Sequence, residues 1–92
     1  MKFIQITSPE TVEELTETEF NALPGSASAT RVKVKHYVLS SKNPDVERKC
    51  DSVTPHVSVR RFLHEVFPSI SFRVAGKLAS LIVYDRQELV IL

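Results

Sequence analysis

The sequence predicts a small α+β domain, in which an antiparallel sheet of about five to six short strands carries two helices packed on one face. Short segments of alternating apolar and polar residues recur along the chain between turn residues. Two other segments have apolar residues at helical spacing. A length of 92 residues, 42% of them hydrophobic and 25% charged, suits a single domain covering residues 1–92 with one core. Many short strands favour local antiparallel pairing, and a split βαβ arrangement is the alternative.

The first quarter of the chain predicts a strand followed by an acidic helix. Phe3, Ile4 and Ile6 form the strand, which Ser8 and Pro9 close. The helix ends at Leu23-Pro24-Gly25, and its start has two solutions, because Thr7 to Glu10 and Thr16 to Glu19 are both capping boxes.

The middle of the chain predicts one long strand over Thr30–Ser40. Its alternation directs Val32, Val34 and Val38 to one side and Arg31, Lys33, Lys35 and Tyr37 to the other. A turn at residues 42–45 follows, and residues 46–53 are either the second arm of a hairpin or a loop.

The last part predicts a helix and three strands. The helix opens at Thr54 and Pro55, ends at Pro68 and has one apolar side, formed by Val59, Phe62, Leu63, Val66 and Phe67. Ile70, Phe72 and Val74 alternate as a strand, Gly76-Lys77 turns the chain, and residues 81–84 and 89–92 form a final hairpin.

The charges are distributed unevenly, although their formal sum is only +1. Residues 1–24 carry five glutamates and one lysine, a net of −4, whereas residues 25–80 carry ten bases and four acids, a net of +6. Such polarity orients a small protein on a charged partner. The five glutamates either favour the start of a helix through its dipole or form a surface for a basic partner.

Two groups of basic residues are candidate binding sites for a partner or a nucleic acid. Arg31, Lys33 and Lys35 lie about 6.6 Å apart along one strand face, close to the phosphate spacing of a single strand, and Tyr37 offers a ring for base stacking. The alternative is an outer face whose lysines protect a sheet edge.

The second group lies on the second predicted helix. Arg60, Arg61 and His64 share its polar side, where arginines can bind phosphate or carboxylate groups. In the alternative, Arg61 pairs with Glu65 and Arg60 is solvated.

No catalytic or cofactor motif is present. Cys50, His56 and His64 have no zinc-like spacing, and His36 is expected on the apolar face of its strand, so we expect no metal and no cofactor. An enzyme that uses Cys50 with a histidine and Asp51 or Asp85 is the remaining catalytic alternative. A single cysteine and short apolar runs suit a soluble protein of a reducing cytoplasm.

In its general character the chain resembles small phage-encoded inhibitors of bacterial defence, and among them the anti-CRISPR proteins that act on RNA-guided surveillance complexes. The resemblance depends on the size, the opening Met1-Lys2-Phe3-Ile4, the lack of a catalytic motif, and the acidic helix beside a basic strand. It implies a non-enzymatic blocker in the host cytoplasm that binds a host protein or ribonucleoprotein, with contacts to its RNA, and no membrane or small-molecule substrate. The alternative is a small protein that binds RNA or single-stranded DNA directly with weak sequence preference.

Overall fold

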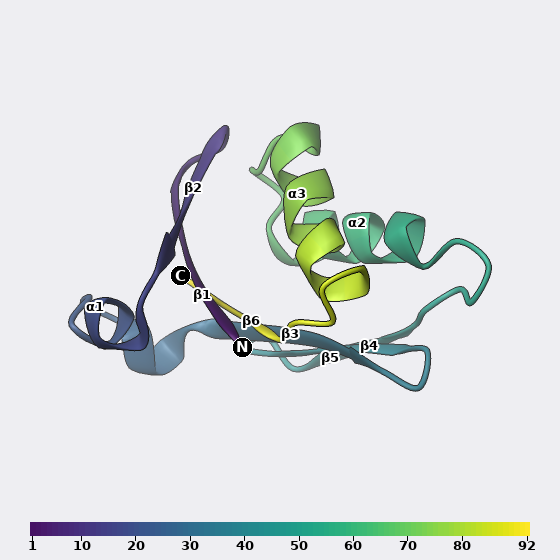
Figure 1. Cartoon of the computed structure of the whole chain (residues 1–92), viewed down its shortest axis with the longest axis horizontal. Helices are drawn as coiled ribbons and strands as arrows, with labels where there is room; N and C mark the ends of the chain where they lie inside the picture. The colour runs from purple at the N-terminus through teal and green to yellow at the C-terminus, as the bar shows by residue number, and fades with distance from the viewer.

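A computed structural model describes all 92 residues, and its centre is one sheet of six strands in the order β2-β1-β6-β3-β4-β5 (Figure 1). The strands are β1 (Lys2–Ser8), β2 (Thr11–Leu15), β3 (Thr30–Lys35), β4 (Val38–Lys42), β5 (Val46–Lys49) and β6 (Leu89–Ile91). All neighbours are antiparallel except β1 and β6, which run parallel. The predicted α+β class is therefore confirmed, with a mostly antiparallel sheet.

Two long helices, α2 (Pro55–Val66) and α3 (Phe72–Val83), lie together on one side of this sheet (Figure 1). Their buried side chains join those of the strands in the main core, which contains Ile4, Val32, Leu39, Phe62 and Leu78 among its 15 buried residues. We call the sheet face that meets these helices the inner face, and the opposite face the outer face.

A second, smaller core lies on the outer face at one end of the sheet. There the short helix α1 (Glu17–Asn21) buries Phe20 against β1 and β6, with Ala29 and Val90 completing the buried cluster. The rings of Phe20 and Phe3 lie 5.3 Å apart. A 3-10 turn, η1 (Ser26–Ser28), leads from α1 to β3.

The acidic segment after β1 begins with a strand, β2, and only then forms α1, so a helix that begins near Pro9 is the wrong solution. The capping box at Thr16 and Glu19 is the one that forms, with both of its reciprocal hydrogen bonds present. Residues 11–15 instead pair with β1, because Val12 can then cover the main core and Leu15 the smaller one.

The predicted strand at residues 70–74, the turn at Gly76-Lys77 and the strand at 81–84 are wrong, because residues 72–83 form the single helix α3. The Ser71 side chain accepts a hydrogen bond from the backbone N–H of Val74 and caps the helix. Val74, Leu78 and Ile82 recur every four residues and face the core. Gly76 lies within the helix beside Arg60.

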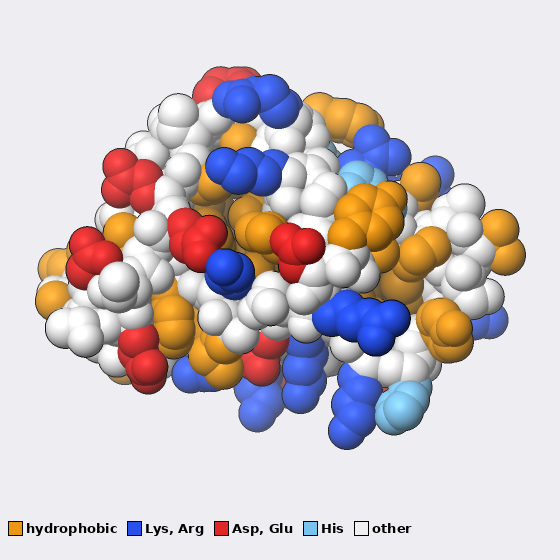
Figure 2. All heavy atoms as spheres, in the orientation of Figure 1, with side chains coloured by type: hydrophobic (Ala, Val, Ile, Leu, Met, Phe, Trp, Pro, Cys, Tyr) orange, Lys and Arg blue, Asp and Glu red, His pale blue; other side chains and the backbone are white.

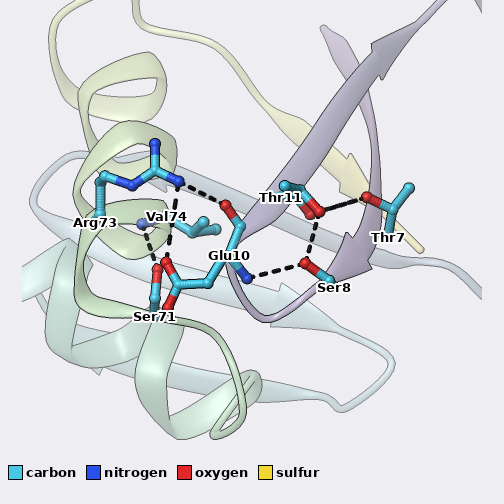
Figure 3. A network of polar contacts seen from close by, with 7 residues as sticks. All are labelled: Thr7, Ser8, Glu10, Thr11, Ser71, Arg73 and Val74. Carbon is cyan, nitrogen blue, oxygen red and sulfur yellow. Dashed lines mark hydrogen bonds and ion pairs between the residues drawn. The ribbon is translucent and has the colours of Figure 1, made fainter.

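The start of α3 is also tied to the turn between β1 and β2 (Figure 3). The backbone N–H of Ser71 donates to the Pro9 carbonyl at 2.8 Å, and the Arg73 guanidinium donates to the Glu10 carbonyl at 2.7 Å. These hydrogen bonds join elements that are far apart in the chain.

The long strand predicted over Thr30–Ser40 is two strands. His36 and Tyr37 have φ of 51° and 60°, and together they form a two-residue turn that reverses the chain between β3 and β4. Of the two alternatives for residues 46–53, the hairpin arm forms over β5, and residues 50–53 are a loop. The helix opened by Pro55 and ended before Pro68 is confirmed.

Candidate binding surface

The open part of the outer face is formed by β3, β4 and β5, and five exposed basic side chains lie on it. Alternation along β3 directs Val32 into the main core and its neighbours Arg31 and Lys33 to the outer face. Cross-strand partners share a face, so Lys42 beside Arg31 belongs to the same surface. We call this set the basic sheet face; its members are Arg31, Lys33, Lys35, Lys42 and Lys49.

Figure 2 shows Lys and Arg side chains projecting together from the side of the molecule that lies below β3, β4 and β5 in Figure 1. Residues that share a face along one strand are about 6.6 Å apart, and neighbouring strands are about 4.8 Å apart. The bases therefore form a two-dimensional array rather than the single stripe expected from the sequence.

Three carboxylates, those of Asp45, Glu47 and Glu88, lie beside these five bases. Glu88 reaches Arg31 at 3.9 Å, an exposed pair that contributes little to stability. Glu47 shares the surface, because it pairs across the strands with Ser40. A shallow groove of about 420 Å³ runs between these groups, and all of its lining residues are polar.

Tyr37 does not share the face of Arg31, Lys33 and Lys35, because it lies in the turn and not on the strand. Its side chain is 60% exposed at the tip of the hairpin. His36 beside it is also exposed, which corrects its expected position on the apolar face. Val38 pairs with Lys35 and thus lies on the outer face, opposite to the prediction.

Arg60, Arg61 and His64 lie on α2, on the other side of the sheet from the basic sheet face. The Arg60 guanidinium sits 5.0 Å from the centre of the Phe72 ring, and the His64 ring is 5.7 Å from the same ring. Both side chains thus pack in the seam between α2 and α3. The two predicted basic groups do not converge on one surface.

Arg61 is exposed on α2, and its expected partner Glu65 pairs instead with Arg48 of β5, at 3.3 Å. That ion pair links the edge strand to the helix above it. Arg48 therefore lies on the inner side of β5, away from the basic sheet face.

Lys42 and Lys49 are members of this surface that the local sequence pattern does not identify. Lys42 falls in a predicted turn, and Lys49 in a segment predicted as either a strand or a loop. The hairpin turn at residues 43–45 is the available signal, because a fixed turn sets the register and so the face of each residue.

The N-terminal glutamates are partly used within the molecule. Glu14 pairs with Lys2 at 2.9 Å, Glu10 lies 3.9 Å from Arg73, and Glu19 belongs to the capping box. The backbone N–H of Thr16 donates to the Glu19 carboxylate and lowers its pKa below the ordinary 4.5. Only Glu13 and Glu17 have no ion pair or side-chain hydrogen bond.

Cys50 is 1% exposed at the end of β5. Burial raises the pKa of its thiol above the ordinary 9.0, and the nearby Asp51 carboxylate acts in the same direction. A thiol in such a site stays protonated at neutral pH and is a weak nucleophile. No group of three or more His, Cys, Asp or Glu side chains is arranged to hold a metal ion.

Comparison of this chain with protein-family models, curated proteins and solved structures finds no match. None of its helices combines the length and apolar character needed to cross a lipid bilayer.

Proposed function

We propose that this chain is a non-catalytic binding protein whose basic sheet face docks on the phosphate backbone of RNA in a host ribonucleoprotein complex. The observation that carries the proposal is the open outer face, where five bases from three adjacent strands face solvent and outnumber the three carboxylates beside them. Arrays of this kind attract a polyanion along its length, since each contacted phosphate releases a counterion.

A flat cationic surface suits a blocker better than an enzyme. The bases are solvated and project from a sheet held rigid by pairing on both sides of β3 and β4, so they keep a fixed spacing. The buried, protonated Cys50 does not support a nucleophilic role. The resemblance to anti-CRISPR proteins implies a protein that blocks its target by occupying the site of a nucleic acid. Such a blocker requires only a binding surface of this kind.

Two matched double variants test the proposal. Lys42→Glu/Lys49→Glu reverses two charges on the basic sheet face, and Arg61→Glu/Lys77→Glu makes the same change of net charge on the exposed helix side. Binding of a labelled single-stranded RNA oligonucleotide is measured by fluorescence anisotropy over a series of salt concentrations.

We expect the sheet-face variant to bind about tenfold more weakly and the helix-side variant to stay near wild type. The slope of log K against log salt should flatten by about 0.7 for each phosphate that the variant no longer neutralises. If both variants lose RNA affinity equally, the loss reflects net charge and not the position of the bases. A wild-type protein that binds no RNA at low salt would overturn the proposal.

A further inference from the structure

A groove of about 590 Å³ opens beside the last residues of β3, at the strand edge that borders the basic sheet face. One wall is the strand itself, from Lys33 to the turn at His36 and Tyr37. The other wall is the segment 86–88 between α3 and β6, and the last turn of α3 contributes Ile82 and Val83. Cavities of this volume are typical of binding sites.

The strand wall is a free sheet edge. The ladder between β3 and β6 stops at Val32 and Leu89, because β6 begins only at Leu89. Alternate residues of a strand direct their backbone groups to the same side, so the N–H and C=O of Val34 point to the side on which Val32 pairs with β6. No backbone hydrogen bond joins Val34 to residues 86–88, which line the far wall of the groove and do not pair with β3. An N–H and a C=O are therefore available to an incoming strand.

The surroundings of this edge define the chemistry of its ligand. Val34, Pro55 and Ile82 give the groove an apolar floor. Lys33, Lys35 and Arg86 stand around it, whereas the single carboxylate, Glu88, is held by Arg31 at 3.9 Å. The groove is thus apolar within and cationic at its rim.

We infer that this groove binds an extended acidic segment of a partner protein, which adds to the sheet as a strand along the free edge of β3. Main-chain hydrogen bonds to Val34 set the register of the bound segment. Alternate side chains of the segment pack on the apolar floor, and the cationic rim selects carboxylates at the positions between them. This interaction goes beyond RNA binding, since it uses the backbone edge of β3 and an apolar floor, although Lys33 and Lys35 belong to both surfaces.

The probe is a labelled peptide of alternating Val and Glu, and the control peptide has the same charges with Pro in place of Val. Val34→Pro removes the donor at the free edge and changes no charge. Val34 lies opposite Leu39 of β4, but its N–H points to the other side of the strand, so no hydrogen bond to β4 is lost. Arg86→Glu reverses one charge of the opposite wall, and Arg61→Glu makes the same change far from the groove.

We expect the wild-type protein and Arg61→Glu to bind the Val–Glu peptide alike and the Pro peptide far more weakly. Val34→Pro and Arg86→Glu should each bind the Val–Glu peptide about tenfold more weakly. A folded Val34→Pro variant that binds as well as wild type would overturn the inference.

If Val34→Pro does not fold, hydrogen exchange of the wild-type protein tests the inference instead. The amide of Val34 should become protected when the peptide is added, and an unprotected amide in the saturated complex would contradict strand addition. RNA binding by the basic sheet face is separable, because Lys42 and Lys49 do not line the groove. Failure of the peptide experiment therefore leaves the RNA proposal standing, and the reverse also holds.

Discussion

The outer face of the sheet has two ends that differ in what covers them. At the end formed by β1, β2 and β6, the helix α1 places Phe20 over Phe3 and Val90 and closes a small core. At the end formed by β3, β4 and β5, no helix covers the face, and exposed bases occupy it. The same surface of one sheet thus contributes a small core at the covered end and an exposed basic surface at the open end.

The largest expected effect at the covered end comes from Phe20→Ala. This ring is 1% exposed, and its removal leaves a cavity that nothing nearby can fill. We expect a loss of about 3–5 kcal/mol in the free energy of unfolding, measured by urea denaturation. The matched change at the open end, Lys42→Glu/Lys49→Glu, should alter that free energy by less than about 0.5 kcal/mol. If both variants lose a similar free energy of unfolding, the two ends of the outer face do not differ in their contribution to stability.

A smaller effect is expected at the tip of the open end. His36 and Tyr37 both adopt positive φ in the turn between β3 and β4, where Asn-Gly is the favoured sequence. Left-handed backbone costs roughly 1 kcal/mol for an ordinary residue. His36→Asn/Tyr37→Gly should therefore stabilise the fold by about 1 kcal/mol, measured by urea denaturation. Because the turn lines the groove, binding of the Val–Glu peptide should weaken at the same time. If the variant gains stability and keeps its peptide affinity, the turn does not contribute to peptide binding in the groove.

The smallest effect is a pH dependence that both ends share. Glu19 in the first turn of α1 and Asp51 before α2 each accept backbone hydrogen bonds as carboxylates, which lowers their pKa from ordinary values of 4.5 and 3.8. A lowered pKa in the folded state gives stability that is present above the ordinary value and lost as the pH falls through the folded one. Thermal unfolding below about pH 4.5 should therefore show falling stability, with a shallower fall in Glu19→Gln and in Asp51→Asn. Variants that keep the wild-type slope would show that other carboxylates control acid unfolding.

Much of the fold could be predicted from local patterns. The strand at Phe3–Ile6, the helix with Pro55 at its start, and the hairpin around Asn43 and Pro44 all carry signals within a few residues. The region of α3 was predicted wrongly because Ile70, Phe72 and Val74 alternate like a strand, while Ser71 as a cap and the four-residue repeat of Val74, Leu78 and Ile82 indicate a helix. A longer window favours the helix, because strand and helix periods cannot be separated over five residues.

The sequence by itself determined the α+β class and the bases that alternate along β3, and it offered two capping boxes, of which the structure forms the one at Thr16. Each of these depends on neighbours within one turn of helix or two residues of strand. Only the tertiary structure decided that Arg60 and His64 pack on Phe72, that Lys42 and Lys49 join the basic sheet face, and that the β3 edge stays free beyond Val32. The reason is that faces and free edges are properties of strand order and register, which pair residues distant in the chain and are not encoded in any short segment.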